Sequence, residues 1–214
     1  MTADDPHRGQ PILAAGAPLE QAAGAVILIH GRGANAADIL GLAQALDRPN
    51  IAYLAPDAAG QVWYPRPFTA PQAMNQPHLG SALNLVGRIF ADLMERGVPP
   101  ERVVLLGFSQ GACLALEYAA RNPRRYGGVV ALSGGLIGDV IAPANYEGSL
   151  AGTPVFLGCS DMDPFIPLTR VQNSTAVMKH LGAEVTERIY RGAGHTIVSD
   201  EVENIQLILD RMVS

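Results

Sequence analysis

The chain has 214 residues, of which 48% are hydrophobic and 16% charged, a composition typical of a compact protein with room for a sizeable core. Its formal net charge is −5 and no basic cluster interrupts that balance, which argues against nucleic acid or an anionic membrane surface as a partner. Residues 1–10 are polar and acidic, unlike a secretory signal, and no apolar run approaches the ~20 residues that span a bilayer. We therefore expect a cytoplasmic protein without stable membrane insertion.

Strands and helices are predicted to alternate along the chain. After a loose N-terminal segment (1–20) in which residues 11–13 form an edge strand, apolar runs predict strands at 25–29, 51–55, 102–106, 127–132 and 154–158, and alternating polarity predicts one at 184–190. Helices are predicted from the cap Asn35 to about residue 46, at 79–96, directly after Ser109, at 168–181 and from Ser199 onward. This alternation, without an internal repeat or a linker, predicts a doubly wound, mostly parallel α/β sheet with helices on both faces, formed by a single domain over 1–214.

The apolar run at 102–106 ends in Gly107-Phe108-Ser109-Gln110-Gly111, the Gly-x-Ser-x-Gly pattern of a nucleophile elbow. A turn this tight from strand to helix leaves no room for side chains beside the serine, which explains the two glycines. The serine is expected at the strand's carboxyl end, where a starting helix directs unpaired N–H groups and its positive dipole end toward an anion.

Three other polar residues are expected beside Ser109. Arg32, Asp163 and His195 each follow a predicted strand, and parallel strands bring such loops together at one edge of the sheet. A serine hydroxyl needs an imidazole to take its proton, and the imidazole needs a carboxylate to fix its tautomer. Serine, aspartate and histidine in this order therefore indicate nucleophilic catalysis.

Three motifs together resemble a known family. Gly-Phe-Ser109-Gln-Gly, then Asp163-Pro-Phe-Ile-Pro, then Gly-Ala-Gly-His195 is similar to the α/β-hydrolase superfamily, and within it to the phospholipase/carboxylesterase family that includes acyl-protein thioesterases. The resemblance runs from about Val26 to the C-terminus. It implies Ser109 as nucleophile, His195 as base, Asp163 as orienting acid, and the backbone N–H groups of Arg32 and Gln110 as oxyanion donors. It implies no metal and no cofactor.

Aromatic residues and an arginine are expected around the reacting serine. The proline-rich loop over residues 58–77 carries Trp63, Tyr64 and Phe68, which either pack beneath the loop or form pocket walls, and Phe165 follows the acid as a further pocket candidate. Arg32 stands where acyl-protein thioesterases typically carry leucine, and its guanidinium would favour a carboxylate or phosphate near the ester.

The remaining histidines and cysteines have simpler expectations. His7 and His180 are expected at the surface, His30 is expected to brace the oxyanion loop, and His78 either lines the pocket or starts a helix. The two cysteines, Cys113 in the elbow helix and Cys159 just after a strand, are expected as buried free thiols, with a disulfide as the alternative. Asp161, two residues before Asp163, is expected to face solvent or cap its loop.

These observations predict a serine carboxylesterase that hydrolyses short- to medium-chain esters through an acyl-enzyme, with a small-molecule ester as its partner. An acyl-thioesterase or a lysophospholipase would use the same triad. A dienelactone hydrolase fits less well because its elbow carries cysteine, and a catalytically silent ligand-binding protein on the same fold is the non-enzymatic alternative. Homodimers occur in similar proteins, but no feature of this sequence demands one.

Overall fold

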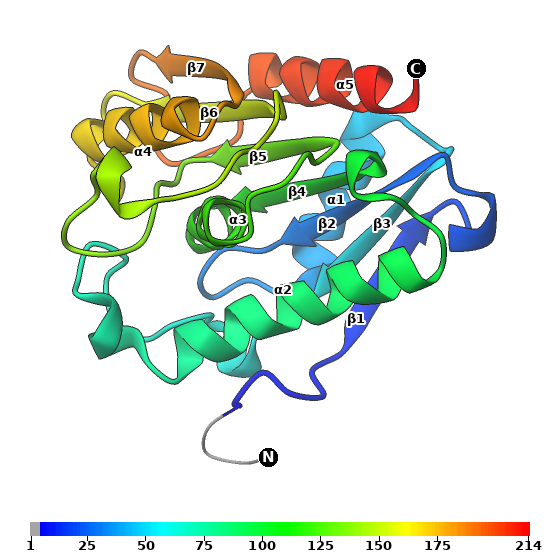
Figure 1. Ribbon diagram of the computed structural model, residues 1–214, viewed down its shortest axis with the longest axis horizontal. Coiled ribbons are helices and arrows are strands. Elements are labelled where there is room, and N and C mark those ends of the chain that lie inside the picture. The colour runs from blue at the N-terminus through cyan, green and yellow to red at the C-terminus, as the bar shows by residue number, and fades with distance from the viewer. Residues whose placement is uncertain (1–4) are drawn as a thin grey trace.

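A computed structural model describes residues 5–214 and contains one seven-stranded sheet (Figure 1). The spatial order of its strands is β1-β3-β2-β4-β5-β6-β7. The strands are β1 (Ile12–Gly16), β2 (Gly24–Ile29), β3 (Ile51–Pro56), β4 (Val103–Phe108), β5 (Gly128–Leu132), β6 (Pro154–Ser160) and β7 (Glu184–Tyr190). Only β1, an edge strand, runs antiparallel to its neighbour; the other pairings are parallel. The predicted α/β fold and the predicted edge strand are confirmed.

Helices cover both faces of this sheet (Figure 1). They are α1 (Ala36–Leu46), α2 (His78–Glu95), α3 (Gln110–Arg121), α4 (Leu168–His180) and α5 (Ser199–Val213). The helices α2, α3 and α4 pack on one face, and α1 and α5 on the other. Along β2, Ile27 enters the first of these cores, whereas Val26 and Leu28 enter the second. Burial on both faces explains the uninterrupted apolar runs in the sequence.

Local signals placed most element ends to within two residues, although β1 ends three residues later than predicted. Asn35 caps α1 as predicted: its side chain accepts from the N–H of Asp38, and the carboxylate of Asp38 accepts from the N–H of Asn35. The strand β6 extends further than predicted, so Cys159 lies within it and not after it. Cys113 and Cys159 are buried free thiols, as expected.

The N-terminal segment is less loose than predicted. Residues 1–4 lie outside the described part of the chain, but His7, expected at the surface, is fully buried. One of its ring nitrogens accepts from the N–H of Ala59, and the other donates to the carbonyl of Trp63. The expectation for His7 was wrong because its burial depends on a loop fifty residues away, which no local pattern reveals. His180 is exposed at the end of α4, as expected.

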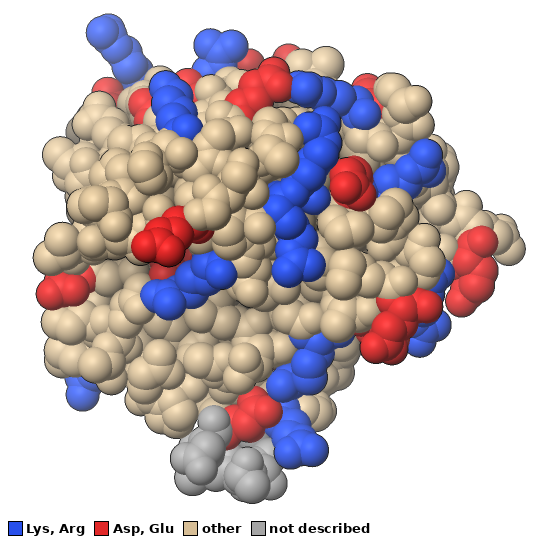
Figure 2. All heavy atoms as spheres, in the orientation of Figure 1, with Lys and Arg blue, Asp and Glu red and all other residues tan. Residues whose placement is uncertain are grey.

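The surface carries charges of both signs. Figure 2 shows one face on which acidic and basic side chains lie close to one another among many neutral residues. Within residues 5–214, none of the helices combines the length and the apolar character that crossing a membrane requires.

Candidate active site

The four parallel strands β2, β4, β6 and β7 bring their carboxyl ends to one edge of the sheet. Arg32 follows β2, Ser109 follows β4, Asp163 follows β6 and His195 follows β7. Residues separated by up to 163 positions in the sequence therefore meet in one place, as expected for ligand sites in sheets of this type.

Ser109 occupies the turn between β4 and α3 in a strained backbone conformation, with φ 55° and ψ −119°. A non-glycine residue pays a conformational penalty there, and such strain is typical of functional sites. The flanking glycines allow the turn to close: a Cβ on Gly107 would overlap the backbone of Gly111, and a Cβ on Gly111 would overlap the carbonyl of Ile29. The turn between β4 and α3 thus requires the Gly-x-Ser-x-Gly pattern for steric reasons.

A continuous hydrogen-bonded chain joins the serine, histidine and aspartate. His195 Nε2 lies 2.9 Å from Ser109 Oγ, and His195 Nδ1 lies 2.7 Å from Asp163 Oδ2. Since an ionised carboxylate can only accept, Nδ1 carries the proton and Nε2 is left to accept from the serine hydroxyl. The side chain of Asp163 is fully buried, and that of His195 is 17% exposed. This arrangement can deprotonate Ser109 as it attacks a carbonyl carbon.

The carboxylate of Asp163 is held in place by several donors. Its Oδ1 accepts from the N–H groups of Phe165 and Ile166, at 2.9 and 3.1 Å, and its Oδ2 also faces the thiol of Cys159 at 3.8 Å. Burial by itself would raise the pKa of Asp163, but the hydrogen bond from His195 and the two backbone N–H groups outweigh it, so the pKa lies below its ordinary value. The group is therefore ionised at neutral pH.

Asp161 has a different position in the same loop. It is exposed, and its Oδ1 accepts a 2.8 Å hydrogen bond from the N–H of Gly192, in the loop that carries His195. The two aspartates therefore have different contacts. Asp163 contacts the imidazole of His195, and Asp161 connects its own loop to the loop that carries His195.

The resemblance implied the backbone N–H groups of Arg32 and Gln110 as oxyanion donors, which requires that both be free of acceptors within the protein. Among residues 5–214, neither the N–H of Arg32 nor that of Gln110 has a hydrogen-bond acceptor in the protein. His30 stabilises the loop that carries the first of them: its Nδ1 donates to the carbonyl of Gly31 at 2.7 Å and its Nε2 accepts from the N–H of Ala58 at 3.1 Å. Burial lowers the pKa of His30, which keeps the ring neutral for these two bonds.

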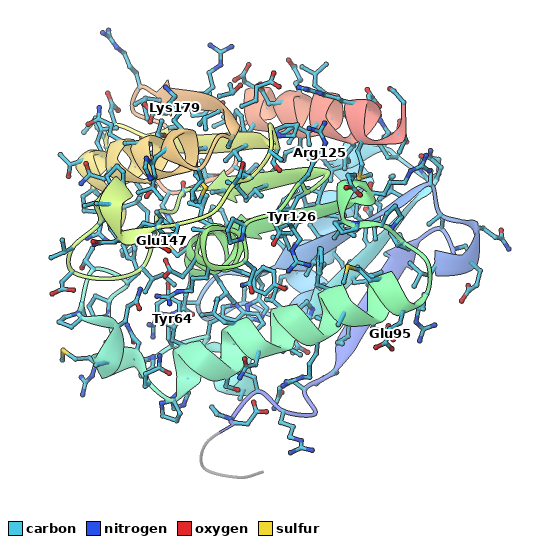
Figure 3. The ribbon with its side chains drawn as sticks, viewed as in Figure 1. Tyr64, Glu95, Arg125, Tyr126, Glu147 and Lys179 are labelled. Atoms are coloured by element: carbon cyan, nitrogen blue, oxygen red, sulfur yellow. The ribbon has the colours of Figure 1, made fainter. Side chains whose placement is uncertain are left out.

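A cavity of about 470 Å³ opens over Ser109 and His195. Three of the four predicted pocket residues, Tyr64, Phe68 and Phe165, line it, and Phe165 is 66% exposed at its mouth. In Figure 3, Tyr64 lies near α3, whereas Glu95 lies at the C-terminal end of α2, on the opposite side of the view. A larger hollow of about 610 Å³, beside Arg121 and Tyr146, contains none of the triad residues.

Trp63 and His78 do not line this cavity. Trp63 is fully buried beneath the loop, where its indole Nε1 donates to the carbonyl of His30 at 2.9 Å. Its pocket role was wrong because adjacent residues of an irregular loop, unlike those of a strand, follow no fixed alternation. His78 is the first residue of α2.

A hydrogen-bonded network that the sequence did not reveal connects the N-terminal segment to the loop that carries Arg32. The Trp63 ring lies between those of His7 and His30, with centroids 5.4 and 4.9 Å away. The side chain of Gln110 accepts from the N–H of Trp63 at 2.8 Å and donates to the carbonyl of Tyr64 at 2.8 Å. The loop over residues 58–64 thus lies against both residues that carry the free N–H groups. Only contacts distant in sequence create this network.

The family model described as phospholipase/carboxylesterase matches residues 12–213, nearly the whole chain. The chain belongs to this family. The family places it among hydrolases that act on ester-type bonds. Within residues 5–214, no group of three or more His, Cys, Asp or Glu side chains is arranged to hold a metal ion.

Other members of the phospholipase/carboxylesterase family are similar over much of their length. A crystal structure of a phospholipase/carboxylesterase from Dyadobacter fermentans is 43% identical, with a TM-score of 0.89 over 96% of this chain and 97% of that one. Esterase PE8 is 26% identical, with a TM-score of 0.76 over 95% and 98%. Acyl-protein thioesterase 1 of Saccharomyces cerevisiae is 30% identical over 63% of this chain and 60% of its own length, so the match spans less than two thirds of that relative.

Proposed function

We propose that this protein is a serine hydrolase that cleaves carboxylic esters through an acyl-enzyme. The observation that carries the proposal is the hydrogen-bonded chain from Ser109 through His195 to the buried Asp163. The single domain that we infer for 1–214 supplies every one of these groups.

The proposed reaction follows from the geometry. As Ser109 Oγ attacks the carbonyl carbon, its proton moves to His195 Nε2, and the N–H groups of Arg32 and Gln110 stabilise the developing oxyanion. The imidazolium then gives that proton to the leaving alcohol, which departs and leaves an acyl group on Ser109. Water, deprotonated by the same imidazole, attacks the acyl-enzyme; the acyl–Oγ bond then breaks, the imidazolium returns the proton to Ser109 Oγ, and the acid is released. Asp163 stabilises the imidazolium in both steps.

The size of the cavity supports short to medium acyl chains. Phe68, Phe165 and Tyr64 offer apolar contact, and each methylene buried in such a pocket contributes ~0.8 kcal/mol until the space is full. We expect kcat/KM to rise with chain length to an optimum at about four to eight carbons and then to flatten or fall.

Labelling with a fluorophosphonate tests the proposed nucleophile. Intact-mass spectrometry should find one adduct on the protein and none on Ser109→Ala, with the modified peptide containing residue 109. A protein that only binds ligands would hold an unactivated serine, so failure to label would contradict the proposal.

A thioester is the second candidate substrate, because the curated relatives that this chain resembles are acyl-protein thioesterases. The Kluyveromyces lactis member is 27% identical over 87% of this chain and 90% of its own length. Comparing kcat/KM for 4-nitrophenyl octanoate and octanoyl-coenzyme A separates ester from thioester specificity, since both deliver the same acyl group to Ser109.

A further inference from the structure

Two arginines, Arg32 and Arg66, line the cavity over Ser109, and no aspartate or glutamate is among its lining residues. Both arginines are exposed. The chain as a whole has 20 acidic and 15 basic residues, so a wall with two positive charges and no negative one departs from its overall balance. Charge of one sign in a cleft raises the local concentration of ligands of the other sign.

Arg32 is held in place by neutral groups. Its Nη2 donates to the carbonyl of Tyr64 at 2.7 Å and to that of Pro65 at 3.3 Å. The Tyr64 carbonyl also accepts from the side chain of Gln110, the residue next to the reacting serine. The guanidinium is therefore fixed relative to Ser109 without a carboxylate to cancel its charge. Its Nε and Nη1 have no acceptor within residues 5–214, so they can bind a ligand.

Arg66 is presented at the same wall. Its backbone N–H donates to the side chain of the buried Asn75 at 2.8 Å, and prolines on both sides restrict its backbone. Its guanidinium has no ion-pair or hydrogen-bond partner within residues 5–214. Because Arg32 reaches the carbonyl of Pro65, the residue directly before Arg66, the two side chains lie on neighbouring parts of one wall.

We infer that this cavity binds esters or thioesters whose acyl part carries a carboxylate or phosphate group at the end away from the reacting carbonyl. Arg32 and Arg66 bind the anion, since the planar guanidinium matches two oxygens of either group, and the aromatic side chains contact the carbons between. This inference rests on the proposed role of Ser109 and narrows its substrate class.

A matched pair of esters tests it. Mono-4-nitrophenyl adipate and 4-nitrophenyl hexanoate have six acyl carbons each and differ by a terminal carboxylate against a methyl group. We expect the ratio of their kcat/KM values, adipate over hexanoate, to exceed one at low ionic strength and to fall about tenfold in Arg66→Gln and in the double variant with Arg32→Leu. Arg66→Lys should retain part of the preference, and 0.5 M NaCl should weaken it.

The control is Arg211→Gln, which removes an exposed arginine that pairs with Glu184 at the start of β7, at the opposite edge of the sheet. It should leave the ratio unchanged. Inhibition of hexanoate hydrolysis by glutarate and by inorganic phosphate distinguishes the two anions, and inhibition by either one requires Arg66.

The outcomes separate this inference from the proposed function. If both esters are hydrolysed and Ser109 is labelled, but the ratio does not respond to Arg66→Gln, the anion subsite is wrong and the serine hydrolase stands. If neither ester is hydrolysed and Ser109 is not labelled, both are overturned.

Discussion

The indole Nε1 of Trp63 donates a 2.9 Å hydrogen bond to the backbone carbonyl of His30, the first residue after β2. This bond joins a buried loop residue to the segment that carries one of the two proposed oxyanion donors. On its other side, the carbonyl of Trp63 accepts from His7 at 2.9 Å. A histidine in the N-terminal segment is therefore connected through Trp63 to the loop that carries the proposed oxyanion donor Arg32.

Replacing His7 by alanine removes both hydrogen bonds of its ring and should loosen this loop. We expect kcat to fall about three- to thirtyfold with little change in KM, less than the ~10²-fold cost of deleting an oxyanion donor. His7→Gln, which keeps a donor and an acceptor, should recover part of the rate. The assay is run well below the melting temperature of each variant, and the exposed His180→Ala serves as control. An unchanged kcat in His7→Ala would rule out this coupling.

Replacing Ser109 by alanine should leave the fold intact and remove nearly all turnover, a loss on the order of 10³- to 10⁶-fold. Alanine removes only the hydroxyl and tolerates the turn about as well as serine. Circular dichroism and the melting temperature check the fold, and kcat/KM on 4-nitrophenyl butyrate checks activity. Turnover within tenfold of the parent would exclude Ser109 as nucleophile.

The two aspartates of one loop should respond very differently to the same change. Asp163→Asn removes the charge that stabilises the imidazolium and favours the wrong tautomer, with an expected loss of about 10³- to 10⁴-fold in kcat. Asp161→Asn keeps an oxygen that can accept from Gly192, so less than tenfold should be lost. A larger loss for Asp161→Asn than for Asp163→Asn would reverse the assignment.

Glu201 should make stability depend on pH. Its side chain is buried at the start of α5, and burial raises the pKa of its carboxyl from 4.5 to about 7. Between these values the folded state binds more protons than the unfolded state, so the free energy of unfolding falls as pH rises from about 4.5 to 7. Glutamine carries no charge but can still accept from the N–H of Val198.

Glu201→Gln should therefore gain stability relative to the parent between pH 5 and pH 8, on the order of 2 to 3 kcal/mol. Chemical denaturation at the two pH values measures the difference. The matched control is Glu203→Gln, an exposed residue of the same helix, which should show no such change. A difference between parent and variant that is equal at both pH values would refute the proposed titration.

The sequence predicted the fold, and it predicted that Ser109, Asp163 and His195 lie together, because these signals are local or follow chain order. Buried parallel strands require continuous apolar runs. The close approach of Gly107 to Gly111 in the turn between β4 and α3 requires glycines at fixed spacing from Ser109. Once strands and helices alternate, the carboxyl ends of the strands must meet at one edge, so the loops with Asp163 and His195 could be assigned to one site without coordinates.

The tertiary structure decided which of several suitable side chains face the site. Trp63 and Tyr64 are adjacent, yet one is buried beneath the loop and the other lines the cavity, because the loop's path depends on the bonds that Gln110 and His7 make to it. The same long-range contacts bury His7, and the loop places Arg66 at the cavity wall. Local patterns determined the elements and the order of the reactive groups, whereas packing between segments far apart in the sequence determined the walls around them.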